Sequence, residues 1–222
     1  MEGEKRWVLS RGEVKAIYDR LGSRQERSAY YEDVAIADLT AHADFAHARR
    51  VFEFGCGTGR VAAELLSCHL PSCASYYAVD LSSTMVHLAA TRLAHWQNRA
   101  VVSRTDGFPG VPFTDGSVDR FVSMYVLDIL SPDDIRSILA EAHRVLTRDG
   151  RLCLISLTHG ATPYARLRSW GWSLVYTFRP HLVGGCRPIP LQDFLVRDWD
   201  LQHVAVVTAG GMSSEVIVAT PR

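Results

Sequence analysis

The pattern of apolar and polar positions along the chain changes near residue 49. Residues 1–48 are mixed and polar, and the spacing of their apolar positions predicts two helices, over 14–21 and 29–46. Beyond this point, short apolar runs typical of buried strands alternate with helical spacing. Strands are expected over 50–54, 75–79, 100–103, 119–126 and 151–157. This alternation predicts a doubly wound α/β sheet of mostly parallel strands with helices on both faces.

Three helices are expected between these strands. The first covers 60–70, and the second begins after a serine cap at Ser82 or Ser83. The third begins at Ser131, where a serine cap, a proline and two acidic residues favour a helix N-terminus, and runs to about Leu146.

The sequence after residue 158 has a different character. Two apolar runs, over 201–207 and 215–219, are joined by A-G-G-M-S-S, which leaves no room for a crossover helix. Strands connected in this way must be antiparallel. The fold predicted is therefore Rossmann-like, with seven strands and an antiparallel C-terminal hairpin. We expect one domain with three parts: a helical N-terminal segment over 1–48, a core over 49–158 and a C-terminal segment over 159–222.

Composition narrows the range of partners. The chain has 222 residues, 47% of them hydrophobic, and its 24 acidic and 24 basic residues balance. A protein that binds nucleic acid usually carries a basic excess, so a small or neutral partner is expected and a nucleic acid is not. No apolar run approaches the length that spans a bilayer, and the N-terminus is charged. Five irregularly spaced cysteines favour free thiols and a cytoplasmic location, whereas the oligomeric state stays open.

A glycine-rich turn after the first expected strand is the strongest local motif. Gly55, Gly57 and Gly59 alternate directly after Glu53 and before a helix. Glycines allow positive φ and let the backbone approach a ligand closely. Dinucleotide-binding proteins use the spacing G-x-G-x-x-G for a pyrophosphate, which a neighbouring carboxylate would repel. The order G-x-G-x-G beside Glu53 suits an ammonium group instead, unless Glu53 is only a solvated residue at a strand end.

Two aspartates follow the next strands. Asp80 ends the second strand, where a carboxylate can accept hydrogen bonds from both ribose hydroxyls of a nucleoside, and its alternative role is to cap the next helix. Asp106 follows the third strand and can accept from an adenine amino group, with Phe108 or Met85 covering the ring. Its alternative is an ordinary surface turn around Asp-Gly.

These motifs together resemble a known family. The sequence contains E-F-G-C-G-T-G-R, then A-V-D-L-S-S-T-M, T-D-G-F-P-G-V-P-F-T-D-G-S-V-D-R-F and E-A-H-R-V-L-T-R-D-G-R-L. Over about 50–158 this is similar to class I methyltransferases, in the style of the small-molecule branch that includes the ubiquinone/menaquinone-type enzymes. The resemblance implies S-adenosylmethionine as cofactor, S-adenosylhomocysteine as product and no metal. It implies that the cofactor is held by Glu53, Gly55, Cys56, Gly57, Gly59, Asp80, Leu81, Met85, Asp106, Gly107, Phe108, Met124 and Tyr125.

Methyl transfer from a sulfonium requires alignment and the exclusion of water, and a base only where the acceptor arrives protonated. Asp128 and His159 follow the fourth and fifth strands and are the candidate bases, although loop polarity or helix capping explains either one equally well. Many relatives carry a histidine soon after the fourth strand, where this chain has Leu127 and Asp128. His143 lies within a helical pattern and is expected to be structural. In the resembling family the N-terminal segment, here 1–48, folds over the cofactor as a lid, and the C-terminal segment 159–222 covers the acceptor side. The ring of Tyr18 either faces the sulfonium or packs the lid onto the core.

The segment over 162–188 combines Trp, Tyr and Phe with arginines. In the resembling family this segment shapes the acceptor site, so an apolar or planar small molecule is expected. A membrane-surface helix and a packed cover helix are the alternatives. The function predicted is S-adenosylmethionine-dependent methyl transfer to a small molecule. An NAD(P)-dependent oxidoreductase and a non-catalytic methyltransferase-like binding domain are the competing hypotheses.

Overall fold

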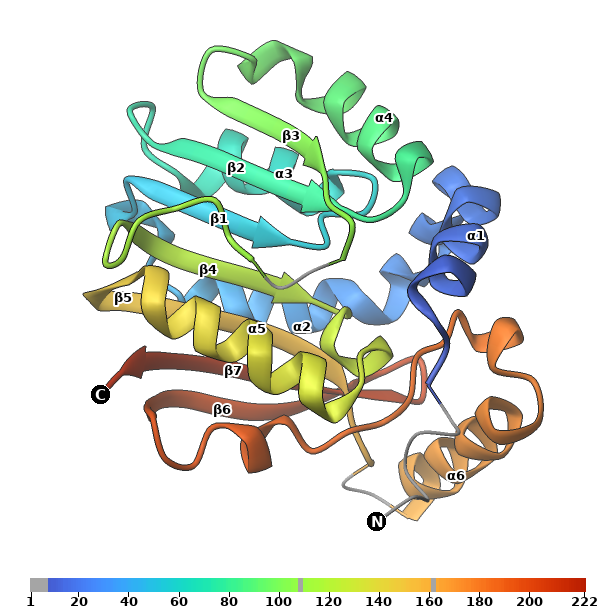
Figure 1. Cartoon of the computed structure of the whole chain (residues 1–222). Helices are drawn as coiled ribbons and strands as arrows, with labels where there is room; N and C mark the ends of the chain where they lie inside the picture. The colour runs from blue at the N-terminus through green and yellow to red at the C-terminus, as the bar shows by residue number, and fades with distance from the viewer. Residues whose placement is uncertain (1–7, 108–109, 161–162) are drawn as a thin grey trace.

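The computed structural model describes residues 8–107, 110–160 and 163–222. Its described part contains one seven-stranded sheet in the order β3-β2-β1-β4-β5-β7-β6 (Figure 1). Strands β1 to β5 are parallel, and β7 lies antiparallel between β5 and β6. The predicted fold class is therefore confirmed. The strands are β1 (Arg50–Phe54), β2 (Ser75–Asp80), β3 (Ala100–Arg104), β4 (Val118–Met124), β5 (Leu146–Leu157), β6 (Trp199–Ala209) and β7 (Met212–Pro221).

Two helical layers cover the sheet and enclose two apolar cores. Apolar side chains of α2, α3 and α4 pack on one face, and those of α5 pack on the other together with the segment 189–199. The helices are α1 (Arg11–Leu21), α2 (Ala29–His42), α3 (Arg60–Glu64), α4 (Ser83–Arg92), α5 (Pro132–Val145) and α6 (Pro163–Phe178). Figure 1 shows α1 beyond the carboxyl ends of β1 and β2, with α6 near the same edge of the sheet. Among the described residues, no helix has the length and hydropathy needed to cross a bilayer.

Element boundaries differ from the expected ones where the chain reverses without a loop. β5 begins at Leu146 and not at 151, because the residue that caps α5 is already extended and leads directly into the strand. The hairpin strands are also longer than expected. Ala209 pairs with Met212, so Gly210 and Gly211, both with positive φ, form a two-residue turn.

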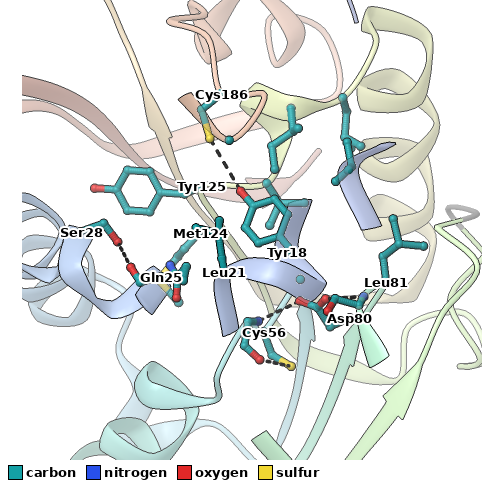
Figure 2. A pocket seen from close by; sticks show the side chains of 18 of the residues that line it. Tyr18, Leu21, Gln25, Ser28, Cys56, Asp80, Leu81, Met124, Tyr125 and Cys186 are labelled. Carbon is teal, nitrogen blue, oxygen red and sulfur yellow. Dashed lines mark hydrogen bonds between the residues drawn. The ribbon is translucent and has the colours of Figure 1, made fainter. Parts of the chain in front are cut away.

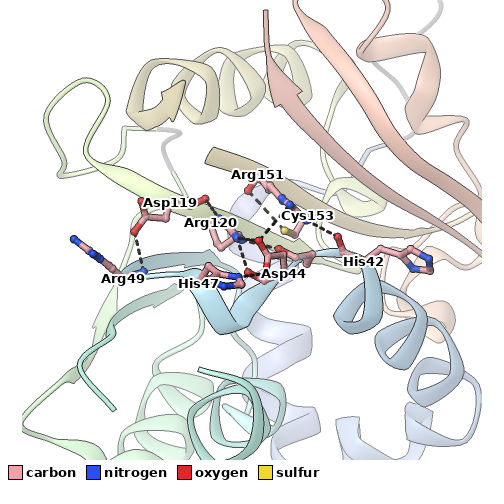
Figure 3. Close-up of polar contacts among 9 residues, drawn as sticks. His42, Asp44, His47, Arg49, Asp119, Arg120, Arg151 and Cys153 are labelled. Atoms are coloured by element: carbon pink, nitrogen blue, oxygen red, sulfur yellow. Dashed lines mark hydrogen bonds and ion pairs between the residues drawn. The ribbon is translucent and has the colours of Figure 1, made fainter. Parts of the chain in front are cut away.

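The second predicted helix ends early, at His42, and two arginines from the sheet cap it (Figure 3). Asp44 takes a left-handed φ of 52° and turns the chain away from the helix. The buried Arg120 donates from Nε to the carbonyl oxygen of Ala43 at 2.7 Å and from Nη2 to that of Asp44 at 2.5 Å. Arg151 donates to the carbonyl oxygen of His42 at 2.8 Å and pairs with the Asp44 carboxylate at 3.3 Å. Cations here satisfy the carbonyls that a helix C-terminus leaves unpaired.

Replacing the buried capping arginine should destabilise the fold strongly. We expect Arg120→Met to lower the free energy of unfolding by about 3 kcal/mol, because buried carbonyl groups lose their donors. Urea unfolding followed by circular dichroism measures the effect. The control is Arg136→Met, which removes an exposed arginine paired with Asp133 and should cost about 0.5 kcal/mol. Equal losses of unfolding free energy in the two variants would show that the capping contacts contribute no more to stability than an exposed ion pair does.

Candidate functional site

A cavity of about 380 Å³ opens at the carboxyl ends of β1, β2 and β4. Helix α1 and the segment Gly22–Ser28 cover it from one side, and residues 172–186 cover it from another. Figure 2 shows Tyr18 of α1 lying between Cys186 and Asp80. The lining combines backbone and carboxylates with aromatic and apolar side chains. In Figure 2, Cys56 and Asp80 lie at one end of the pocket, and Tyr125 and Cys186 lie at the other.

The three glycines after β1 have different tasks, although all three have positive φ. A Cβ atom at Gly55 would lie 2.3 Å from Cγ2 of Val126, and one at Gly59 would lie 3.0 Å from Cα of Ala89. Both positions therefore need glycine for close packing within the protein. A Cβ at Gly57 would meet only the side chain of Gln25, at 3.7 Å. The middle glycine thus faces open space in the cavity, as a position that meets a ligand should.

The Asp80 carboxylate is fixed at the edge of this turn. Oδ2 accepts a hydrogen bond from the backbone N–H of Gly57 at 2.9 Å, and Oδ1 accepts from that of Ser82 at 2.9 Å. Burial raises the pKa of Asp80, and these backbone hydrogen bonds oppose the shift. Ser82, and not Asp80, caps α4 by accepting from the N–H of Met85. The helix-cap alternative is therefore wrong, and each carboxylate oxygen retains a lone pair for a hydroxyl.

The Glu53 side chain is buried beside the same turn and is only 2% exposed. Its Oε2 accepts from the hydroxyl of Tyr76 at 2.9 Å. Burial raises the pKa of Glu53 to about 7, the hydroxyl hydrogen bond opposes this, and the charge of Asp80 adds to it. The alternative of a solvated strand-end residue is therefore wrong. A buried carboxylate with one neutral partner is suited to receive a cation.

Aromatic side chains from three distant segments line the opposite end of the cavity. The ring of Tyr31 meets that of Tyr125 edge to face, with centroids 5.9 Å apart. The hydroxyl of Tyr18 lies 3.8 Å from Sγ of Cys186, and Nε1 of Trp172 donates to the Cys186 carbonyl at 3.0 Å. Burial raises the pKa of all three tyrosines, which are therefore neutral. The three tyrosine rings offer flat, uncharged surfaces.

Tyr125 holds a strained backbone at the junction of the two ends. Its φ is 56°, which is uncommon for a residue other than glycine and often marks a functional position. The structure stabilises this conformation with a hydrogen bond from the Tyr125 N–H to the carbonyl of Ile155 at 2.8 Å. The tyrosine hydroxyl also bonds to that of Ser214 at 2.8 Å. Met124, Tyr125 and the packed Val126 all line the cavity, in agreement with the position expected for the first two.

The structure brings neither candidate base into the cavity. His159 is exposed and does not line it. Asp128 lies in a short turn, Leu127–Ile129, and is completely buried. Its Oδ2 accepts from the N–H of Leu157 at 3.1 Å, and burial raises its pKa to about 7. Among the described residues, Oδ1 has no hydrogen-bond partner. Of the three predicted catalytic residues, only Tyr18 lines the cavity.

Three predicted cofactor contacts, Met85, Asp106 and Gly59, do not line the cavity. Met85 is fully buried in the core and does not line the cavity, whereas Leu81 does. Asp106 is exposed and does not line the cavity, although its neighbour Gly107 does. Phe108 lies outside the described residues. The other predicted contacts, all of which line the cavity, are Glu53, Gly55, Cys56, Gly57, Asp80, Leu81, Gly107, Met124 and Tyr125; Gly59 packs beneath the turn on Ala89.

Glu32 of α2 also lines the cavity, although it was not predicted from the sequence. It is 6% exposed, Arg60 donates to it at 3.3 Å, and burial raises its pKa. A signal was present in the sequence, because Glu32 shares helical spacing with the buried Ala35, Ile36 and Leu39. A carboxylate on the apolar side of a helix indicates a special position.

Some of the remaining residues that the sequence singled out have structural roles, and others line the cavity. His143 meets Trp199 edge to face at 5.3 Å and is structural, as expected. Helix α6 turns Trp172 into the cavity, while Trp170 is 62% exposed. Arg187 donates to the carbonyls of Asp128 and Leu130 and thus supports the turn after β4. All five cysteines are free, as predicted.

Comparisons with known proteins found that this chain is similar to methyltransferases. A family model described as a methyltransferase domain matches residues 51–150. The tRNA N(3)-methylcytidine methyltransferase Mettl2 of Drosophila melanogaster is 26% identical over 155 residues, which are 68% of this chain and 47% of that protein. The ubiquinone/menaquinone biosynthesis C-methyltransferase UbiE of Citrifermentans bemidjiense is 28% identical over 116 residues, covering 51% and 48%. The chain spans about half the length of these two curated relatives.

Among solved structures, the 4+2 cyclase SpnF superimposes with a TM-score of 0.72 and 14% identity, covering 96% of this chain and 97% of that one. Likeness at this level of identity shows the fold alone. The name of that protein also shows that one fold supports different reactions. The function therefore has to be inferred from the residues that line the cavity.

Proposed function

We propose, from the premise that residues 51–150 form an S-adenosylmethionine-dependent methyltransferase domain, that this chain methylates a small apolar or planar molecule by in-line displacement. One observation carries the proposal. A carboxylate-and-backbone end and an aromatic end share a single cavity, which Met124 and Tyr125 also line. The first end suits the cofactor, and the second suits a flat, uncharged acceptor.

The residues present fit the cofactor. The unfilled space beside Gly57 admits a nucleoside, and the fixed carboxylate of Asp80 can accept from its ribose hydroxyls. Glu53, whose hydrogen-bond partner is the neutral hydroxyl of Tyr76, can neutralise the ammonium of the methionine part. The cofactor supplies an activated methyl group on a sulfonium. The protein's part is to hold both reactants in line and to exclude water with α1 and the aromatic wall.

Charge compensation at the cavity favours a neutral acceptor over a nucleic acid. Three of the four arginine and lysine side chains that line the cavity are paired with carboxylates: Arg11 with Asp134, Lys15 with Asp19, and Arg60 with Asp33 and Glu32. The fourth, Arg24, is exposed and has no ion pair among the described residues. Nucleic-acid binding depends on basic groups that are available to phosphates. The tRNA methyltransferases among the relatives are therefore the second candidate, and the quinone methyltransferase is the better guide to acceptor class.

Cofactor affinity should depend on pH through Glu53. Only the ionised carboxylate pairs with an ammonium, and its pKa in the free protein is about 7. Below that pH, binding must first remove a proton, so affinity falls as the pH decreases. We expect S-adenosylhomocysteine to bind about tenfold more weakly at pH 6 than at pH 8 in calorimetric titrations. In Glu53→Gln this difference should vanish, and a pH effect that survives the substitution would contradict the assignment.

The aromatic end should control acceptor affinity alone. We expect Trp172→Ala to raise the KM for the acceptor about tenfold and to leave S-adenosylhomocysteine affinity within about twofold, because the indole lines the cavity and donates to the Cys186 carbonyl at 3.0 Å. Trp170→Ala is the matched control, since this exposed tryptophan lies two residues away on the same helix. Steady-state kinetics with a methyl-accepting substrate measure the effect. Equal KM values for the two variants would contradict the proposed acceptor wall.

A direct assay tests the function itself. Calorimetry with S-adenosylhomocysteine should give micromolar affinity, and NADH should not bind. The protein is then incubated with methyl-tritiated S-adenosylmethionine and, separately, with lipophilic phenols and quinols or with tRNA. Label in the organic extract supports the proposal. Label in tRNA alone would replace it with the second candidate, and cofactor binding without any transfer would favour a non-catalytic domain.

A further inference from the structure

Three potential metal ligands meet on the surface of the fold, away from the cavity. Asp38 and His42 lie one turn apart on α2, and His203 lies on β6, against which α2 packs. Glu32, which lines the cavity, precedes His42 on the same helix by ten residues, or about 15 Å of helical rise. The cluster is therefore separate from the cofactor site, and its chemistry is independent of the proposed function.

The side chains already converge. Nε2 of His203 lies 2.7 Å from Oδ2 of Asp38, and Nδ1 of His42 lies 3.8 Å from Oδ1 of the same residue. The two imidazole rings stack with centroids 3.6 Å apart and an interplanar angle of 6°. One ligand atom from each of the three residues lies within 4.8 Å of the other two.

We propose that Asp38, His42 and His203 form a binding site for a divalent transition metal ion, with Zn²⁺ the best match. Two imidazole nitrogens and one carboxylate oxygen are donors that zinc commonly uses, and water can complete a tetrahedral set. Metal-bound nitrogens at about 2.0–2.1 Å require ligand atoms roughly 3.3 Å apart. Because each nitrogen lone pair lies in the plane of its ring, the parallel rings of His42 and His203 must turn relative to each other before both can bind one ion.

Two further features favour the site. The Nδ1 atom of His42 lies 2.8 Å from the backbone carbonyl oxygen of Asp38, and a histidine that donates to a carbonyl in this way directs its other nitrogen toward a metal. The cluster is also accessible, because the side chain of His42 is 44% exposed, whereas those of Asp38 and His203 are less so. A bound ion would connect α2 to β6 and thereby stabilise the native fold.

Calorimetric titration of the untagged protein with zinc chloride tests the proposal. Cys68 and Cys73 are exposed and could bind zinc by themselves, so both are first replaced by serine. We expect one Zn²⁺ per chain with micromolar affinity, and at least tenfold weaker binding in His42→Ala and in His203→Ala. His47→Ala is the matched control, because His47 pairs with the Asp44 carboxylate at 2.6 Å and should leave affinity unchanged.

Co²⁺ titration provides a second measurement, because tetrahedral nitrogen and oxygen ligation gives strong visible absorption. That absorption should appear in the serine background and disappear in His42→Ala. Circular dichroism confirms that each variant is folded, and His42→Gln replaces any alanine variant that is not. Absence of binding at millimolar zinc would overturn the proposal. Binding that survives both histidine substitutions would overturn it equally.

Discussion

In Gly57→Val, S-adenosylhomocysteine binding should be lost, with affinity at least about a hundredfold weaker, while the fold remains intact. The valine side chain would project into the space beside the glycine turn, where its Cβ atom would meet only Gln25, at 3.7 Å. The added side chain therefore occupies space that the ligand needs, without displacing other parts of the protein. The φ of 52° adds strain of about 1–2 kcal/mol, which lowers stability without unfolding a domain of this size.

A matched control separates strain from steric exclusion. Gly116 has a φ of 59° and has no atom within 4 Å of an added Cβ. Gly116→Val should therefore show the same loss of stability and retain full affinity. Calorimetry measures binding, and thermal unfolding measures stability. If both variants lost affinity alike, backbone strain and not occupation of the cavity would be the cause.

In Asp80→Ala, S-adenosylhomocysteine affinity should fall by at least tenfold. Charge-assisted hydrogen bonds to the ribose hydroxyls contribute about 1.5–3 kcal/mol, and alanine removes the acceptor of both. The glycine turn should keep its shape, because Gly55 and Cys56 also donate to the carbonyl of Val79, at 2.8 and 3.0 Å. Circular dichroism and calorimetry together test this expectation.

Two further substitutions sharpen the comparison. Asp80→Asn retains one acceptor oxygen, so its affinity should lie between that of the alanine variant and the parent. Asp106→Ala should change affinity less than twofold, because Asp106 is exposed and does not line the cavity. Unchanged affinity in Asp80→Ala, or a large loss in Asp106→Ala, would reverse the roles assigned to the two aspartates.

The centre of the sheet was predictable because β1, β4, β7 and the second half of β5 are buried on both faces and read as apolar runs. What failed was the location of boundaries. Nothing in the sequence around Leu146 shows that the residue that caps α5 is extended, so the start of β5 was placed too late. The end of α2 was placed too late for a similar reason. Arg120 and Arg151, distant in sequence, cap the helix at His42 and stabilise the turn at Asp44.

The site was predictable where a residue's role follows from its place in the strand-turn-helix unit. Asp80 and Glu53 line the cavity because β1 and β2 are neighbours whose carboxyl ends coincide. The position of a residue after a strand places its backbone at the carboxyl edge of the sheet but does not fix the direction of its side chain. The prediction for Asp128 failed for this reason. The turn after β4 directs this carboxylate back to the N–H of Leu157. The contribution of Glu32 depends on how α2 packs, which no local motif describes.

The position of β7 in the sheet also has a consequence for how this protein is made. β6 is synthesised before β7, yet in the described sheet β7 is the strand that separates it from β5. While the ribosome is still adding residues 212–221, β6 has no neighbour with which to pair. Assembly of this half of the molecule must therefore wait for translation of those residues, and a nascent chain arrested before them would expose an unpaired β5 edge prone to aggregation.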